Sequence, residues 1–207
     1  MRVTEIFQSI QGEGPDVGKR AIFIRMHGCN LSCPWCDTKY SWDDANYYEM
    51  DSQIILDWIN RTPDVKNVVI TGGEPLLQLD ELIPLIQTLR DSGRHVALET
   101  NGTIIPPDLS IFDLVVVSPK GIDTANNWCK ILSENKNVKL KLVIHQKNID
   151  MMIEWIKEKG LSGIYLMPIG SDPNTLAIGS IAIFDKMIEM HVDCIISPRV
   201  HILVGIK

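Results

Sequence analysis

Strand-like and helix-like segments alternate along most of this 207-residue chain, and this alternation restricts its fold more than any other feature. Short β-branched runs at residues 66–71 and 138–144 are each followed by apolar residues at helical spacing, at 76–90 and 149–159. Parallel strands joined by helices produce this order of segments. The pattern therefore predicts an α/β fold.

Six core strands are expected, at residues 21–26, 66–71, 94–99, 112–117, 138–144 and 163–167. A closed barrel of this kind has eight strands, so the sequence predicts a partial, open (β/α)6-type TIM-like barrel with an N-terminal extension. A last helix is predicted from Asp172-Pro173 to about Met190, whereas two prolines within 105–108 disfavour a helix after the third core strand. No linker is long enough to divide the chain, so we expect a single domain over residues 1–207.

Composition and charge exclude several classes of function. The net charge of −6 disfavours nucleic acid as a partner, because phosphate binding requires concentrated Lys and Arg. No apolar run approaches the roughly 20 residues that span a bilayer, and the first residues lack the apolar core of a secretory signal. Three of the five cysteines are clustered, which is not the pattern of an extracellular disulfide framework. We therefore expect a cytoplasmic protein without membrane partners.

The clustered cysteines, Cys29, Cys33 and Cys36, follow the first predicted core strand within one short loop. Three thiolates can bind three irons of a four-iron cluster and leave the fourth iron open, whereas electron-transfer clusters normally have four protein ligands. A zinc site with His27 or Asp37 as the fourth ligand is an alternative, although structural zinc usually takes paired ligands from two separate segments. The spacing favours an iron–sulfur cluster with an open iron.

Further polar clusters follow the ends of the predicted strands, where parallel α/β folds place their binding sites. They comprise Thr71-Gly72-Gly73-Glu74-Pro75, Glu99-Thr100-Asn101-Gly102-Thr103, Ser118-Pro119-Lys120-Gly121 and Pro168-Ile169-Gly170. Each cluster alone is compatible with an ordinary turn or a solvated strand end. Because all of them follow strand ends, together they predict a binding site at that edge of the sheet.

The three-cysteine loop, with Trp35 before its last cysteine and Gly-Gly-Glu-Pro after the next strand, resembles the radical S-adenosylmethionine superfamily. The resemblance implies a 4Fe-4S cluster on the three cysteines, with S-adenosylmethionine bound to the fourth iron. Backbone groups of Gly72, Gly73 and Glu74 would hold the amino group of that cofactor. The cofactors would generate a 5′-deoxyadenosyl radical that takes a hydrogen atom from the substrate, and the protein would orient the reacting carbon.

A narrower resemblance covers nearly the whole chain. It is carried by residues 8–14, Phe23-Ile24-Arg25, Gly28-Cys29-Asn30-Leu31, Cys36-Asp37-Thr38 and Ser197-Pro198-Arg199-Val200-His201, together with the strand-end clusters. In these motifs the chain resembles 7-carboxy-7-deazaguanine synthases. The members of that family are lyases that convert 6-carboxy-5,6,7,8-tetrahydropterin to 7-carboxy-7-deazaguanine with loss of ammonia, on the route to queuosine. The resemblance also implies a homodimer and a reductant such as flavodoxin.

The same resemblance assigns roles to individual positions. Contacts with the pterin are implied for Ile10, Gln11, Gly12, Arg25 and Thr71. Thr38 would bind Mg²⁺, an ion that keeps several waters and takes few protein ligands. The S-adenosylmethionine site would comprise Trp35, Asp37, Gly72, Gly73, Glu74, Glu99, Ser118, Pro119, Lys120, Met167, Pro168, Ile169 and Gly170. Met167 stands where the family often has Gln, and Lys207 is a candidate because some members direct their terminal carboxylate at the substrate.

Two other functions fit part of the pattern. Another radical S-adenosylmethionine enzyme, such as a glycyl-radical activase, uses the same cysteine spacing but does not need the pterin and magnesium contacts. A non-catalytic iron–sulfur or zinc module would leave the Gly-Gly-Glu-Pro turn and the clusters at Glu99 and Ser118 unexplained. The sequence therefore favours an enzyme that makes a 7-deazapurine precursor.

Overall fold

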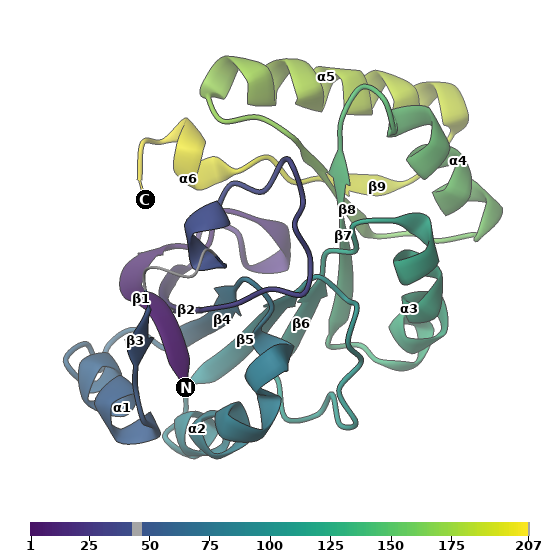
Figure 1. Ribbon diagram of the computed structural model, residues 1–207. Coiled ribbons are helices and arrows are strands. Elements are labelled where there is room, and N and C mark those ends of the chain that lie inside the picture. Colours follow the sequence, from purple (N-terminus) through teal and green to yellow (C-terminus); the bar gives the residue numbers. More distant parts are fainter. Residues whose placement is uncertain (43–46, 207) are drawn as a thin grey trace. The chain divides into compact units, whose positions relative to one another are not determined.

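The computed structural model describes residues 1–42 and 47–206, and the chain forms two compact units. The first unit consists of Met1–Ser9 and Lys19–Val117, and the second of Ile10–Gly18 and Ser118–Lys207. In both units strands alternate with helices, as the sequence predicts (Figure 1). Within the described residues, no helix is both long enough and apolar enough to cross a bilayer.

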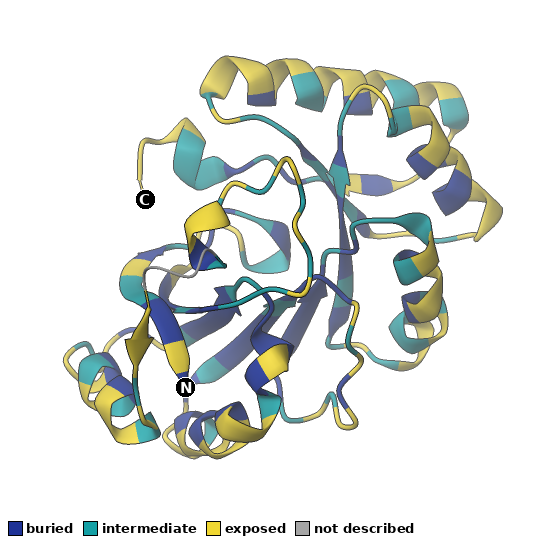
Figure 2. Ribbon diagram, viewed as in Figure 1, coloured by how far each residue is buried: buried dark blue, intermediate teal, exposed yellow. Residues whose placement is uncertain are grey.

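Strands of the first unit form a sheet with a parallel centre. They are β1 (Arg2–Ile10), β2 (Arg20–Met26), β3 (Tyr48–Glu49), β4 (Asn67–Gly72), β5 (His95–Thr100) and β6 (Leu114–Val117), in the order β3-β1-β2-β4-β5-β6. Neighbours from β2 to β6 are parallel, whereas β1 and β3 are antiparallel. The central strands are buried along nearly their whole length (dark blue in Figure 2), which explains their continuous β-branched runs.

Two helices and two short 3-10 turns complete the described part of the first unit: α1 (Ser52–Asn60), α2 (Leu79–Asp91), η2 (Lys39–Ser41) and η3 (Pro75–Gln78). Helix α2 packs on β5 and buries Leu82, Leu85, Ile86 and Leu89, the spacing of one helical face. The expected helix began at residue 76. The observed helix begins at Leu79, because the residues from Pro75 onward first form the 3-10 turn.

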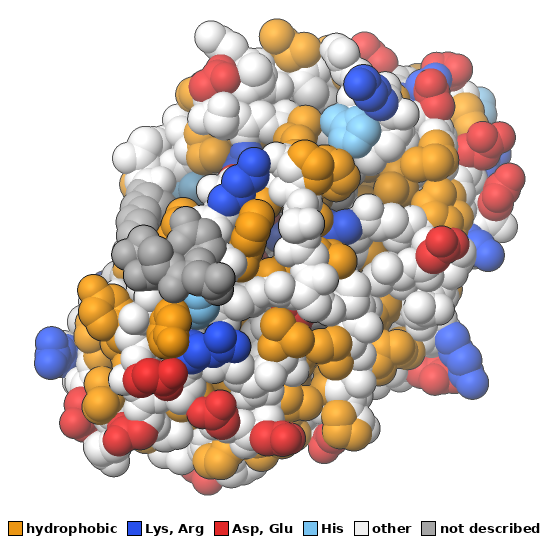
Figure 3. All heavy atoms as spheres, viewed as in Figure 1, with side chains coloured by type: hydrophobic (Ala, Val, Ile, Leu, Met, Phe, Trp, Pro, Cys, Tyr) orange, Lys and Arg blue, Asp and Glu red, His pale blue; other side chains and the backbone are white. Residues whose placement is uncertain are grey.

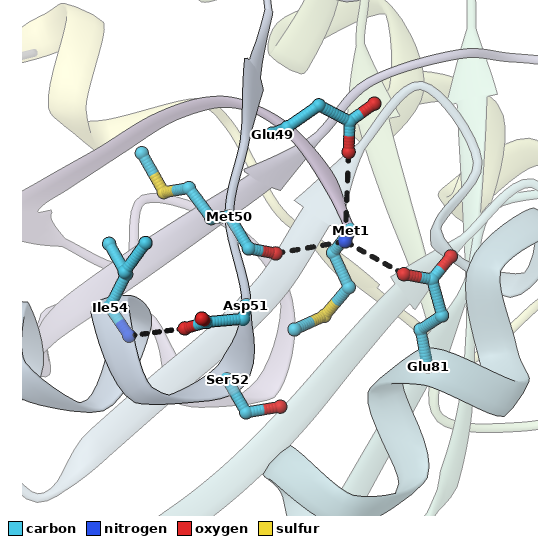
Figure 4. A pocket seen from close by; sticks show the side chains of 7 residues that line it. All are labelled: Met1, Glu49, Met50, Asp51, Ser52, Ile54 and Glu81. Atoms are coloured by element: carbon cyan, nitrogen blue, oxygen red, sulfur yellow. Dashed lines mark hydrogen bonds and ion pairs between the residues drawn. The ribbon is translucent and has the colours of Figure 1, made fainter.

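A shallow pocket of about 490 Å³ surrounds the amino terminus in the first unit (Figure 4). The Met1 ammonium donates a hydrogen bond to the carbonyl of Met50 at 2.8 Å. It also pairs with the carboxylates of Glu81 at 2.7 Å and Glu49 at 4.0 Å. These contacts fix the start of β1. The residues that line the pocket include none of the predicted site residues, so the pocket is not the predicted site.

The second unit contains three parallel strands with helices between them. The strands are β7 (Val138–Ile144), β8 (Ile164–Pro168) and β9 (Cys194–Ile196), and the helices are η1 (Gly14–Asp16), α3 (Ile122–Glu134), α4 (Ile149–Glu158), α5 (Pro173–Met190) and α6 (Val200–Leu203). Helix α5 begins where Asp172-Pro173 predicts. The carboxylate of Asp172 accepts hydrogen bonds from the backbone N–H groups of Asn174 at 2.9 Å and Thr175 at 3.1 Å.

All six predicted core strands are present, with ends that differ from the prediction by no more than two residues. No helix lies between β5 and β6, a stretch that the structure describes throughout, which confirms the effect of the proline pair. The described strands and α-helices without a sequence prediction are β1, β3, β9, α1, α3 and α6. On the face shown in Figure 3, Lys and Arg side chains lie scattered among Asp and Glu.

Candidate active site

The three loop cysteines follow β2 in the first unit, are partly exposed and form no disulfide. The backbone N–H of Leu31 donates a hydrogen bond to the Cys29 sulfur at 3.4 Å, and the Asn101 amide donates to it at 3.8 Å. The indole N–H of Trp42 donates to the Cys36 sulfur at 3.5 Å. Such donors stabilise thiolate ligands and adjust the potential of a cluster. The donor set therefore fits a 4Fe-4S cluster.

The protonation of Cys29 depends on the same surroundings. Burial raises the pKa of its thiol, the Leu31 N–H bond lowers it, and the nearby Glu74 carboxylate raises it further. A ligated cysteine is a thiolate, so cluster binding must displace this proton. Within residues 1–42 and 47–206, no three Cys, His, Asp or Glu side chains surround one metal-ion position. In a cubane each thiolate binds a different iron, so the ligands need not converge on one point.

The Gly72-Gly73 turn after β4 lies directly against the start of the cysteine loop. The backbone N–H of Glu74 donates to the Gly28 carbonyl at 2.8 Å, and that of Gly73 donates to the Met26 carbonyl at 3.2 Å. A Cβ on Gly73 would lie 2.0 Å from the Gly28 oxygen. One on Gly72, whose φ is +135°, would lie 2.2 Å from the Met26 oxygen. Both positions therefore require glycine.

Glu74 is completely buried, and its side chain connects elements of the fold. Its carboxylate accepts hydrogen bonds from the Thr100 hydroxyl at 2.9 Å, the backbone N–H of Asn101 at 2.7 Å and that of Leu76 at 3.0 Å. These bonds join the ends of β4 and β5 and cap η3. Because its side chain is engaged inside the protein, a ligand contact at Glu74 would come from the backbone, as the resemblance implies.

Arg25 is held in a defined orientation near the end of β2. Its Nε donates to the Glu5 carboxylate at 2.9 Å, and the Tyr40 hydroxyl donates to the same oxygen at 2.9 Å. Its guanidinium carbon lies 5.5 Å from the centre of the Phe7 ring and 5.8 Å from that of Tyr40. Among the described residues, the two terminal nitrogens of Arg25 make no hydrogen bond. That edge of the guanidinium can take a carboxylate in bidentate fashion.

Two residues predicted to contact different ligands are neighbours. Thr71 is the last residue but one of β4 and lies beside Glu99 of β5, and its hydroxyl donates to the Glu99 carboxylate at 3.0 Å. Thr38, the implied magnesium ligand, precedes η2, and its hydroxyl lies 3.7 Å from the Cys36 sulfur. Trp35 and Asp37 are exposed on the same loop. The first unit therefore gathers these predicted residues around the cysteine loop and the ends of β2, β4 and β5.

In the second unit, the segment after β9 holds the backbone of residues 11–14. The N–H of Gly14 donates to the Ser197 hydroxyl at 2.7 Å, and the N–H of Val200 donates to the Gly12 carbonyl at 2.9 Å. Two predicted pterin contacts, Gln11 and Gly12, are buried here, and Ile10 directly precedes them. The C-terminal motif of the resemblance thus supports the loop predicted to bind the pterin.

Two further residues support this loop: His201, which belongs to the C-terminal motif but has no predicted role, and Lys141, which sequence reasoning missed. The imidazole of His201 packs on Gly12, where a Cβ would lie 1.8 Å from its Nδ1. Lys141 of β7 is buried, and its ammonium pairs with the Glu13 carboxylate. Residues 138–144 alternate apolar and polar, which predicts that Lys141 faces solvent. No pattern in the sequence indicates its distant acidic partner.

The other predicted S-adenosylmethionine contacts lie at strand ends, as the sequence predicts. Ser118-Pro119-Lys120 follows β6, and the Lys120 ammonium donates to the Ser118 hydroxyl at 2.9 Å. Met167 and Pro168 end β8. The N–H of Ile169 donates to the carbonyl at the end of β7 at 2.9 Å, and Gly170 lies closely against the start of α5.

A protein-family model described as the Radical SAM superfamily matches residues 23–174. The chain is 34% identical to 7-carboxy-7-deazaguanine synthase from Hyperthermus butylicus, over 99% of this chain and 92% of the relative. It is 32% identical to the Thermoplasma acidophilum protein of the same name, over 97% of this chain and 95% of the relative. The chain belongs to the 7-carboxy-7-deazaguanine synthase family.

The solved structure of QueE from Escherichia coli has a TM-score of 0.69 and 26% sequence identity, and the match covers 97% of this chain and 94% of QueE. This likeness confirms the predicted fold class, a partial TIM-like barrel. Membership of the 7-carboxy-7-deazaguanine synthase family confirms the predicted cofactors, which are a 4Fe-4S cluster, S-adenosylmethionine and Mg²⁺.

Proposed function

We propose that this protein converts 6-carboxy-5,6,7,8-tetrahydropterin to 7-carboxy-7-deazaguanine and releases ammonia, as a lyase of queuosine biosynthesis. The observation that carries the proposal is the likeness to 7-carboxy-7-deazaguanine synthases over 97–99% of the chain. The cysteine loop and the arginine at the end of β2 supply the chemical groups that such a reaction requires.

Cys29, Cys33 and Cys36 would hold three irons of the cluster, and the N–H donors beside Cys29 and Cys36 would stabilise their thiolates. When bound, the cluster supplies the electron that cleaves S-adenosylmethionine, which leads to removal of a hydrogen atom from the substrate. The backbone at Gly72 and Gly73 would bind the amino group of S-adenosylmethionine. The close packing of this turn on the cysteine loop fixes its position relative to the cluster.

Arg25 would bind the substrate carboxylate through its two terminal nitrogens. Glu5, Phe7 and Tyr40 hold the guanidinium plane, so little side-chain freedom is lost when the substrate binds. Ile10, Gln11, Gly12 and Thr71 would make the remaining contacts with the pterin, and Thr38 would bind Mg²⁺ through its hydroxyl oxygen.

The rest of the S-adenosylmethionine site would be formed by Trp35, Asp37, Glu74, Glu99, Ser118, Pro119, Lys120, Met167, Pro168, Ile169 and Gly170. Glu74 would act through its backbone, because its carboxylate is buried and hydrogen-bonded within the protein. Met167 would also use its backbone, since a thioether is only a weak acceptor. Lys207 lies outside the described residues.

Residues 1–207 would act as a single radical S-adenosylmethionine domain, in a cytoplasmic homodimer that receives electrons from a reductant such as flavodoxin. The three loop thiols support a cytoplasmic location, because a reducing compartment keeps them available for the cluster. The net charge of −6 supports a small-molecule substrate rather than a nucleic acid.

The deciding experiment incubates the anaerobically reconstituted protein with 6-carboxytetrahydropterin, S-adenosylmethionine, Mg²⁺ and a chemical reductant. We expect a product lighter than the substrate by one ammonia, identified by mass. Cys36→Ala should abolish it, whereas Cys129→Ala, a cysteine outside the loop, should leave it unchanged. Cleavage of S-adenosylmethionine with the pterin unchanged would contradict the proposal and favour another radical enzyme, such as a glycyl-radical activase.

A further inference from the structure

Helix α5 carries apolar residues on two opposite faces. On its inner face Leu176 and Ile183 are buried, and the helix contacts β8, β9 and α4. Gly179 lies on this face, where a Cβ would approach the Cβ of Pro168 to 2.7 Å. The inner face therefore accounts for the packing of α5 within the second unit.

The outer face of α5 carries four large apolar side chains that are more than half exposed. They are Ile178 (61%), Ile181 (60%), Phe184 (53%) and Ile188 (58%). Intervals of three and four residues place them in one stripe, about 15 Å long at 1.5 Å per residue. The turns of α5 are largely yellow in Figure 2, the colour of exposed residues. A helix that is apolar on both faces is normally covered on both.

We propose that this stripe is the surface on which a second copy of the chain docks, with the two α5 helices antiparallel about a two-fold axis. The inference deepens the proposed function by naming the surface of its homodimer. The stripe is centred near residue 183, so antiparallel pairing sets Ile178 against Ile188 of the second copy and Ile181 against Phe184. The stripe thus complements itself, as a two-fold interface requires.

The exposed apolar area of the stripe is large enough for the docking of a second copy. Four side chains of this size at these exposures form an apolar patch on the order of 500 Å², at the upper end of what monomeric proteins expose. Two such patches bury about 1,000 Å² together before flanking residues are counted, which reaches the range of stable interfaces. Lys186 lies on the side of α5 that faces α4, where it pairs with Asp150 of α4 at 2.8 Å and with Glu189 at 2.7 Å. Asp185 and Glu189 are exposed beside the stripe, so carboxylates border it, as polar rims border apolar interface cores.

The first test measures the mass of the full chain in solution by sedimentation over a range of concentrations. We expect a dimer, and we expect Ile181→Lys to raise its dissociation constant by roughly 30-fold or more, as for a central interface residue. Ile54→Lys is the matched control, because Ile54 is 50% exposed on α1, and it should leave the dimer unchanged. A monomeric wild type, or a dimer that Ile181→Lys leaves intact, would overturn the proposal.

A mixing experiment tests the antiparallel register. Phe184→Glu alone should also weaken the dimer, but an equal mixture of Ile181→Lys and Phe184→Glu chains should form a heterodimer in which the new charges meet. Failure of the mixture to associate while the wild type does would overturn this pairing. Circular dichroism confirms that each variant is folded. An active monomer would contradict the proposed dimer surface and leave the proposed reaction standing. A dimer that α5 holds together but that lacks activity would contradict the proposed reaction and leave the dimer surface standing.

Discussion

The cysteine loop and the Gly72-Gly73-Glu74 turn lie against each other in the first unit, but they are held in different ways. The loop has three partly exposed thiols, and two of its sulfurs accept hydrogen bonds of 3.4–3.8 Å, the usual length for a sulfur acceptor. The turn has a fully buried carboxylate with three hydrogen bonds of 2.7–3.0 Å, and its two glycines touch the backbone of neighbouring residues.

This contrast separates two requirements of the site. The turn is organised by the protein itself, so it is formed before any cofactor binds. The loop would be completed by the cluster that we propose it binds. Substitutions in the loop should therefore remove the chemistry and leave the metal-free chain folded, whereas substitutions in the turn should lower the free energy of unfolding.

The largest effect is expected for Cys33→Ala. Loss of one cluster ligand should reduce turnover to an undetectable level and remove the iron and the visible absorption of the reconstituted protein. The free energy of unfolding of the metal-free chain should change by less than about 0.5 kcal/mol, because the thiol is partly exposed. Cys129→Ala should retain the iron. Full activity of Cys33→Ala would contradict the cluster assignment.

Gly73→Ala should have the largest effect on stability. Its methyl group would lie 2.0 Å from the Gly28 oxygen, so backbone must move, at a cost of about 3 kcal/mol. Chemical denaturation of the metal-free protein measures this loss. Gly121→Ala is the control, because nothing lies within 4 Å of the added Cβ. Gly121 precedes the first residue of α3, and its replacement should lower the free energy of unfolding by less than about 1 kcal/mol. Equal losses would show that the turn is not constrained as described.

Glu74→Gln should lower the free energy of unfolding by about 2 kcal/mol, because an amide NH2 group cannot accept the hydrogen bonds that the buried carboxylate accepts. Glu99→Gln provides the comparison. Glu99 is only half-buried and accepts a bond from Thr71, so we expect a loss below about 1 kcal/mol. Denaturation curves of both variants, recorded without metal, measure the two losses of free energy of unfolding. An equal or larger loss in Glu99→Gln would contradict the structural role of Glu74.

Arg25→Lys should have the smallest effect. It should weaken substrate binding and leave the cysteine loop and the Gly72-Gly73-Glu74 turn unchanged. An ammonium cannot form the bidentate pair, so the KM for the pterin should rise about 10-fold while the iron content is unchanged. The control Arg20→Lys changes an exposed arginine and should leave KM unchanged. A fall in kcat with constant KM would contradict a role in carboxylate binding.

The sequence predicts those parts of the fold in which local pattern and tertiary packing agree. The core strands are recognisable because buried parallel strands are continuously β-branched, and α5 because Asp172-Pro173 caps it. Helix α3 is not recognisable, since only Ala125 and Trp128 of its residues are buried. The contact between Thr71 and Glu99 depends on the pairing of β4 with β5, which sequence spacing does not determine.

The order in which this enzyme can mature follows from one contact described above. Gly12 and Gly14, near the beginning of the chain, are bonded to Val200 and Ser197 near its end. Ser197 is synthesised 183 residues after Gly14, so the loop proposed to bind the pterin cannot close until that later segment has left the ribosomal exit tunnel. Substrate recognition is thereby postponed until residues 197–200 have emerged.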